Sequence, residues 1–141
     1  MSQINGVVKG LVTNVNDPEK KGRIKARFQS LERQHETDWI QIATIGGKNR
    51  GSSFTPEIND EVLIAFDRGD ARFPFVIGFL WDGQQKPSVR SEGPVVIEDA
   101  HGNTISMSNG KIVIKSPGMV EIKGAMITIN GRVVAPNANP I

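Results

Sequence analysis

The chain has 141 residues, of which 38% are hydrophobic and 23% charged, and its formal net charge at pH 7 is only +2. This composition excludes wholesale disorder, and so small a positive excess gives little reason to expect nucleic-acid or membrane binding. The chain has no cysteine, which excludes disulfides and thiolate metal sites. It also shows no secretory signal at its N-terminus and no apolar run near the roughly 20 residues of a membrane helix, so we expect assembly in the cytoplasm.

Five segments within residues 1–88 have strand patterns, and none has a convincing helix pattern. Apolar and polar residues alternate in the second and third segments, whereas the fourth and fifth are mostly apolar, as in strands buried on both faces. Five strands in this length predict a small antiparallel barrel, of which the OB-fold is the best-populated example. The segments are GVVKGLVTN (6–14), GRIKARF (22–28), WIQIAT (39–44), EVLIAF (61–66) and FPFVIGFLW (73–81).

The connections between these segments have loop and turn composition. NDPEKKG (16–22) opens with Asp-Pro and closes on glycine, and DRGDARFP (67–74) predicts a tight link between the last two strands. His35 falls in a polar stretch that predicts a loop. Pro74 cannot donate to a strand ladder, so we expect it at the start of the fifth strand or on an open edge. Trp39 and Trp81 are expected in the barrel core or at a contact between subunits.

The pattern changes after residue 88, where a connector leads through SVRSEGPVVIE (88–98) into short repeated strands. Aliphatic residues recur at alternate positions, and glycines follow at short intervals, which is typical of a solenoid-like stack. The inward-facing residues predicted from this pattern are Ile105, Met107, Ile112, Ile114, Val120, Ile122, Ile127, Ile129 and Val133. The glycines predicted at the corners, where the lack of a Cβ permits sharp turns, are Gly102, Gly110, Gly118, Gly124 and Gly131.

A single layer of such strands would leave the backbone groups at its edges unpaired and its apolar face exposed to solvent. One chain could coil into a parallel β-helix, but that fold needs longer and more numerous rungs. The segment could also fold back onto the barrel, which suits its short and uniform strands poorly. The sequence favours a third arrangement, in which three identical chains intertwine as a β-prism and their inward aliphatic residues meet at the threefold axis.

Three stretches of the first half resemble the OB-fold of phage baseplate spike proteins, a family that includes gpV-type baseplate assembly proteins and the spike portion of VgrG proteins. They are GLVTNVNDPEKKGRIKARF (10–28), DWIQIAT (38–44) and FTPEINDEVLIAFDRGDARFPFVIGFLW (54–81). Asn59 stands where the family commonly has glycine. The second half, including the turn EDAHGNTISM (98–107), resembles the trimeric β-helix of the same family.

The resemblance implies an all-β homotrimeric central spike at the tip of a contractile tail, in a phage, an R-type bacteriocin or another injection system. Residues 1–88 would form the OB-fold collar beneath a separate hub protein. Residues 89–141 would form a trimeric β-helix that pierces the target cell envelope. The final residues would either fold over the open end of the needle or contact a separate PAAR-like tip protein. The residues concerned are Pro136, Asn137, Asn139, Pro140 and Ile141.

No residue pattern predicts catalysis, a cofactor site or a metal site. His35 and His101 lie in polar stretches without a ligand set around them, and Asp67, Asp70 and Asp82 have no nucleophile or histidine beside them in sequence. The alternative function is an OB-fold module that binds nucleic acid or carbohydrate and carries an oligomerising β tail. The basic row Arg23, Lys25 and Arg27 would serve that module, but exposed aromatic residues for base stacking do not accompany it, so we expect no nucleic-acid partner.

Overall fold

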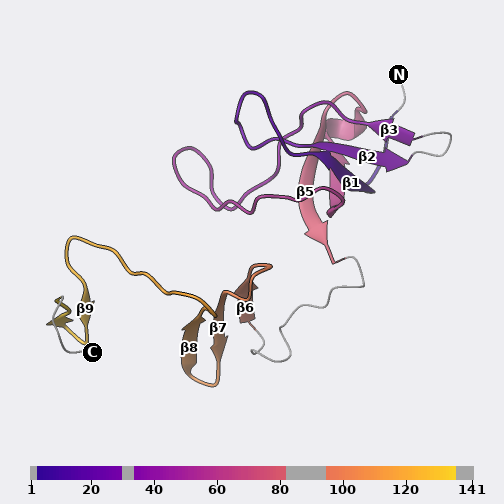
Figure 1. Cartoon of the computed structure of the whole chain (residues 1–141). Helices are drawn as coiled ribbons and strands as arrows, with labels where there is room; N and C mark the ends of the chain where they lie inside the picture. The colour runs from indigo at the N-terminus through magenta and orange to yellow at the C-terminus, as the bar shows by residue number, and fades with distance from the viewer. Residues whose placement is uncertain (1–2, 30–33, 82–94, 136–141) are drawn as a thin grey trace. The chain divides into compact units, whose positions relative to one another are not determined.

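The computed structural model describes residues 3–29, 34–81 and 95–135, and these residues form two units (Figure 1). The first unit comprises residues 1–86 and the second residues 87–141. The predicted domain boundary between residues 88 and 89 falls outside the described residues and stays a prediction. The described fold is all-β, with one 3-10 turn at Asp67–Gly69 as its only helical element. None of the helical structure in the described ranges is long and apolar enough to span a membrane.

The first unit is built on one five-stranded antiparallel sheet with the order β3-β2-β1-β4-β5. The 3-10 turn forms the tight link predicted between the last two strands, where the amide of Asp67 donates to the carbonyl of Phe73 at 2.9 Å. Pro74 is the first residue of β5, as predicted from its missing N–H. The strands are β1 (Val8–Asn14), β2 (Lys25–Gln29), β3 (Gln34–Glu36), β4 (Glu61–Phe66) and β5 (Pro74–Leu80).

The segment around Ile40 and Ile42 closes this sheet into a barrel. Ile40 pairs antiparallel with Ile24, just before β2, and Ile42 pairs in parallel with Val76 of β5. Both amide–carbonyl hydrogen bonds of the Ile24–Ile40 pair form, at 2.8 and 3.1 Å. This segment therefore pairs with the residue before β2 on one side and with the edge strand β5 on the other. It links the two ends of the sheet, as an OB-fold barrel requires.

The strand predicted over residues 39–44 is therefore wrong in detail, because the structure has isolated bridges there and a strand, β3, immediately before. Thr37 lies at the break between β3 and these bridges. Its amide donates to the carbonyl of Ala26 at 2.8 Å, but its Oγ1 also accepts the amide of Ala26 at 3.0 Å. A side-chain hydroxyl thus accepts the hydrogen bond that a backbone carbonyl would accept between regular paired strands. The loop predicted at His35 is likewise wrong, since His35 lies in β3 and stacks on Phe28 with ring centroids 5.3 Å apart.

The barrel core consists of nine buried apolar residues that alternate along the strands. Val62, Ile64 and Phe66 of β4 are buried, while the residues between them are half-buried, so the prediction that β4 is buried on both faces was too strong. In β5 only Val76 is buried, because a β-bulge opposite Leu63 and Ile64 disturbs the alternation. The core residues are Val12, Ile24, Ala26, Phe28, Ile40, Val62, Ile64, Phe66 and Val76.

Gly10 lies where β1 passes closest to its neighbours. A Cβ at this position would lie 2.8 Å from Ile64 Cδ1 and 2.9 Å from the carbonyl oxygen of Arg27. We expect Gly10→Ala to lower the free energy of unfolding of the barrel by about 1–3 kcal/mol, because a backbone oxygen cannot rotate away as a side-chain tip can. Urea unfolding followed by circular dichroism measures the change. Gly78→Ala in β5, where a Cβ would meet nothing within 4 Å, is the control, and equal losses in both variants would contradict this account.

Asn59 precedes β4 in a left-handed conformation, with φ of 73°. Its amide donates to the carbonyl of Val12 at 2.8 Å, which ties the turn to the core. Asparagine tolerates this conformation better than other non-glycine residues. We expect Asn59→Gly to leave the melting temperature nearly unchanged and Asn59→Ala to cost roughly 1–2 kcal/mol. Equal stability of the two variants would contradict the role assigned to this φ angle.

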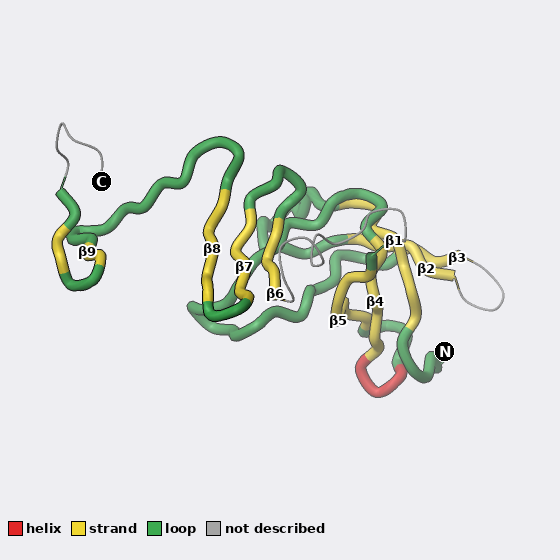
Figure 2. The backbone as a smooth tube through the Cα atoms, turned by 90° about the horizontal axis from the view of Figure 1, so that it is seen from below, coloured by secondary structure: helices red, strands yellow, loops and turns green. Residues whose placement is uncertain are grey.

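The second unit contains a three-stranded antiparallel sheet and a separate small hairpin (Figure 2). Asn109-Gly110 and Asn130-Gly131 form two-residue turns with positive φ throughout, as type I′ hairpin turns require. Each of these strands pairs with a neighbour in its own chain, and the predicted pairing between chains stays a prediction. The sheet has the order β6-β7-β8, and its strands are β6 (Val95–Glu98), β7 (Thr104–Ser108) and β8 (Lys111–Lys115). The hairpin is made of β9 (Thr128–Ile129) and β10 (Arg132–Val133).

No strand forms between residues 116 and 127, although the sequence predicts one around Val120 and Ile122. Figure 2 shows this stretch as an extended chain running from β8 to β9. Val120 and Ile122 are exposed here. A strand needs a hydrogen-bonding neighbour, and the described part of a single chain supplies none to the backbone of residues 116–126.

Candidate functional site

The three-stranded sheet β6–β8 has one face made of apolar side chains in register. Val95, Met107 and Ile112 lie opposite one another across the three strands, and Ile97, Ile105 and Ile114 form the next row. All six are between 43% and 68% exposed. We call these six residues the apolar face. A contiguous apolar patch of this kind marks an interaction surface.

The opposite face of the same sheet holds the buried residues, although they are polar. Thr104 and Ser106 of the central strand β7 are only 7% and 3% exposed. Val96 and Val113 lie on either side of Ser106, so larger neighbours cover the small central side chains. In the single chain the small polar side chains of the central strand are therefore buried, while the apolar face is exposed, which is the reverse of a stable isolated sheet.

Four of the nine predicted inward residues lie in the apolar face: Ile105, Met107, Ile112 and Ile114. Val95 and Ile97 were missed, because three consecutive apolar residues precede Glu98 and hide the alternation in β6. The other five predicted residues lie outside this sheet. Four of these are exposed and Ile127, whose carbonyl accepts the amide of Val134 at 2.7 Å, is half-buried. They are Val120, Ile122, Ile127, Ile129 and Val133.

Three of the predicted corner glycines, Gly102, Gly110 and Gly131, lie in turns with φ between 74° and 87°. The turn that contains Gly102 is also held by Asp99, whose Oδ1 accepts the amides of His101 and Asn103. The hydrogen bond from the side-chain amide of Asn103, followed by these backbone bonds, lowers the pKa of Asp99. Gly118 and Gly124 do not have positive φ, so a left-handed corner does not explain them. The predicted tip residues 136–141 lie outside the described residues.

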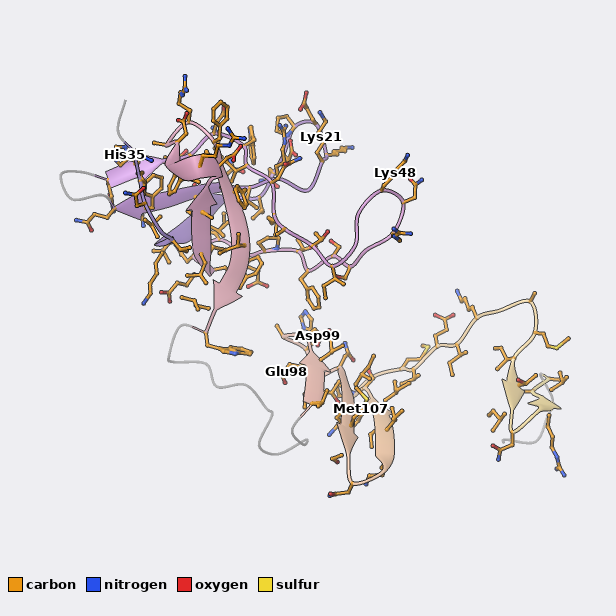
Figure 3. The ribbon with its side chains drawn as sticks, turned by 180° about the vertical axis from the view of Figure 1, so that it is seen from behind. Lys21, His35, Lys48, Glu98, Asp99 and Met107 are labelled. Carbon is orange, nitrogen blue, oxygen red and sulfur yellow. The ribbon has the colours of Figure 1, made fainter. Side chains whose placement is uncertain are left out.

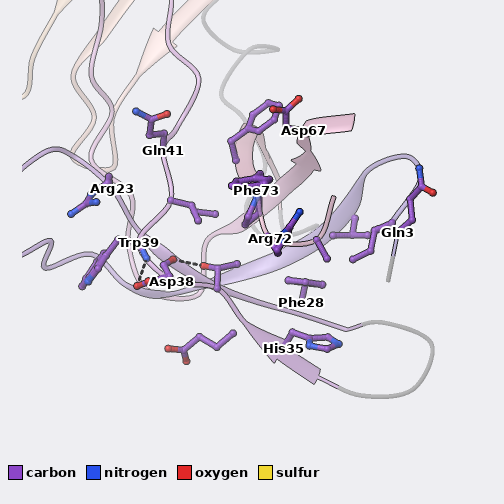
Figure 4. A pocket seen from close by; sticks show the side chains of 18 of the residues that line it. Gln3, Arg23, Phe28, His35, Asp38, Trp39, Gln41, Asp67, Arg72 and Phe73 are labelled. Carbon is purple, nitrogen blue, oxygen red and sulfur yellow. Dashed lines mark hydrogen bonds between the residues drawn. The ribbon is translucent and has the colours of Figure 1, made fainter. Parts of the chain in front are cut away.

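The barrel contains a groove of about 1630 Å³ between its N-terminal residues, the β2–β3 hairpin and the start of β5 (Figure 4). Its cations are already engaged: Arg72 pairs with Asp70 at 2.7 Å, and Arg23 pairs with Asp17 at 2.9 Å. Lys25 covers the ring of half-buried Trp39, with Nζ 5.3 Å from its centroid. Engaged cations and a covered aromatic ring give a nucleic-acid strand little to bind here.

The loop between β1 and β2 is organised by Asp17, whose side chain is only 3% exposed. Its two carboxylate oxygens accept the amides of Glu19, Lys21 and Arg23 and two guanidinium hydrogen bonds from Arg23. The guanidinium and these amides hold the pKa of Asp17 well below its usual range, and the carboxylate raises the pKa of Arg23. The loop is thus fixed by one almost fully saturated carboxylate, a role that the sequence indicated only as turn chemistry.

The described ranges contain no cluster of three or more histidine, aspartate or glutamate side chains that could hold a metal ion. His101 lies in an exposed turn. Trp81 is 60% exposed, so it does not lie in the barrel core of the single chain.

Residues 8–81 match the family described as the Type VI secretion system/phage-baseplate injector OB domain. The chain belongs to this family. The match covers β1 to β5 and the bridges that close the barrel, so the first unit is an injector OB domain. The predicted resemblance to baseplate spike proteins of the VgrG and gpV type is confirmed.

Two curated relatives come from Pseudomonas aeruginosa: the Type VI secretion system spike proteins VgrG1a and VgrG1b. Each is 29% identical to this chain over 72 residues, or 48% of the chain. The chain spans about a tenth of the length of these relatives, since the matches cover 11% of VgrG1a and 10% of VgrG1b. The similarity supports a structural role related to a spike in a phage tail or secretion apparatus.

Proposed function

We propose that the chain is the structural central spike protein of a contractile tail or injection system, and that it acts as a homotrimer without enzymatic activity. The exposed apolar face carries this proposal, because a sheet with this face can be stable only when something covers it. Three copies would place their β6–β8 sheets as the three walls of a prism, with the apolar faces inward. Burial of six such side chains contributes roughly 10 kcal/mol per chain.

The extended stretch between residues 116 and 127 supports the intertwined part of the prism. Up to residue 126 its backbone has no hydrogen-bonded strand neighbour within the described chain, and Val120 and Ile122 are exposed there. In the proposed trimer each stretch pairs with those of the other two chains. A chain interlocked in this way cannot leave without breaking shared ladders, so the needle would resist unfolding kinetically as it is driven into an envelope.

The OB domain, proposed as residues 1–88, would be the collar that attaches to a separate hub protein, and residues 89–141 the piercing needle. The open lower end of the prism would be covered by a PAAR-like tip protein that contacts residues 136–141. The assembled particle would form in the cytoplasm before it becomes part of a phage or a phage-tail-like particle.

Resistance to detergent tests this function against the nucleic-acid-binding alternative. We expect the unheated protein to migrate as a trimer in SDS gels and to dissociate only on boiling. We also expect no salt-dependent binding to single-stranded DNA in fluorescence anisotropy. A protein that runs as a monomer without heating and binds the strand at low salt would overturn the proposal.

A further inference from the structure

A second, smaller cavity of the OB domain, about 400 Å³, combines aromatic and acidic residues. Phe54 and Trp81 are 64% and 60% exposed, and Phe79 is 41% exposed. Asp60 and Glu61 line the same cavity, and Glu57 lies beside it, with its amide donating to Asp60 Oδ2 at 2.9 Å. We call these six residues the acidic groove. Within the described ranges none of its three carboxylates has an ion-pair partner.

The loop of residues 45–51 has the opposite chemistry, and we call it the basic knob. Ile45 at its base is 82% exposed, and Lys48 and Arg50 are exposed with no ion pair among the described residues. Figure 3 shows Lys48 at the tip of this loop, pointing into solvent.

Two glycines give the basic knob a narrow neck. A Cβ on Gly46 would lie 3.1 Å from the carbonyl oxygen of Arg50, and one on Gly51 would lie 3.1 Å from that of Ile45. The amide of Arg50 donates to the carbonyl of Gly47 at 3.1 Å, and Thr44 Oγ1 donates to the carbonyl of Gly46 at 3.1 Å. The loop is therefore preformed, so little conformational entropy would be lost if it entered a partner surface.

We propose that the basic knob of each chain occupies the acidic groove of the next chain around the threefold axis. Ile45 would pack on the exposed aromatic residues, and Lys48 and Arg50 would face the three carboxylates. Because knob and groove are different surfaces of one chain, the contact is head-to-tail, and three such contacts close a ring when successive chains are related by a 120° rotation. This inference rests on the proposed homotrimer and adds a contact between the OB domains of neighbouring chains, which the prism first brings together.

Engineered cysteines test the contact directly, since the chain has none of its own. Gly47→Cys marks the knob, because a Cβ there would meet nothing within 4 Å, and Thr55→Cys marks the cavity of the groove. Each variant is carried by a separate, differently tagged full-length chain. Treating the co-expressed, purified trimer with a bis-maleimide cross-linker should join the two tagged chains. Neither variant expressed alone should cross-link, which controls for contacts between like positions.

Charge reversal then tests the proposed chemistry. We expect Lys48→Glu with Arg50→Glu on the knob chain to abolish the cross-link. Glu57→Lys with Glu61→Lys on the groove chain should restore it. If light scattering shows a trimer but the two tagged chains never cross-link, the knob-and-groove contact is overturned. The same holds if the cross-link is unaffected by both charge reversals. Neither outcome contradicts the proposed spike function. A monomeric full-length chain overturns the spike function itself.

Discussion

Replacing Ile114 with aspartate is expected to leave the protein monomeric. Ile114 stands in the row Ile97–Ile105–Ile114 of the apolar face, so the proposed trimer would bring three carboxylates together near one axis. Desolvation and mutual repulsion would oppose assembly, and protonation of the carboxyl groups would relieve this only at acidic pH. Light scattering at pH 7 should give the mass of one chain instead of three.

The matched control for this variant is Lys111→Asp on the same strand. Lys111 lies on the opposite face of β8 and is exposed, so a carboxylate there stays in water and the trimer should form normally. A stable trimer of Ile114→Asp would show that the apolar face is not the inner surface. Ile122→Asp extends the test to residues 116–127, where we also expect assembly to fail.

Replacing Asp17 with asparagine is expected to lower the melting temperature of the OB domain substantially. The substitution keeps the shape of the side chain but removes the charge that binds Arg23 and replaces one acceptor oxygen by a donor that faces backbone amides. When one partner of a nearly buried ion pair is removed, the other charge stays buried without an opposite charge beside it, which is strongly destabilising. The control is Asp70→Asn, because the Asp70–Arg72 pair is 25% and 58% exposed and should matter far less.

The pH dependence of this effect follows from the direction of the pKa shift. The folded-state pKa of Asp17 lies below the value of about 3.9 of an unfolded chain, so the carboxylate stabilises the folded state fully above that value. This contribution is lost as the pH falls from about 4 towards the folded-state pKa. The melting temperatures of the wild-type protein and Asp17→Asn should therefore differ most near pH 7 and converge in strong acid. A difference that does not depend on pH would contradict the assigned role of the charge.

The barrel strands were predictable where a strand buries one side and exposes the other. Lys25 to Gln29 alternates cleanly, and the buried residues Ala26 and Phe28 follow from that alternation alone. Thr37 was not predictable, because its side chain replaces a ladder acceptor, and no pattern of hydrophobicity reports such a hydrogen bond. The bulge in β5 escaped prediction for a similar reason, since it depends on pairing with β4.

For the second unit, the sequence predicted which residues of β8 share an apolar face, but not which strands pair with one another. The alternation of Ile112 and Ile114 with lysines identified the apolar side of β8 correctly as one face. The turns were interpreted as corners of a stack, although Asn-Gly at positions 109–110 and 130–131 is a strong hairpin signal. The alternation favours association of the apolar sides, but the local pattern of one chain does not distinguish pairing within a chain from pairing between chains.

The native mass of the full-length protein, measured by light scattering beside a version that ends at residue 88, tests the central claim most directly. The account predicts a trimer for the full chain and a monomer for the shortened one, because the prism formed by the second unit would be the main source of association. A full-length protein that is monomeric at micromolar concentration would contradict the account, since its apolar face would then be stable in water without a partner copy.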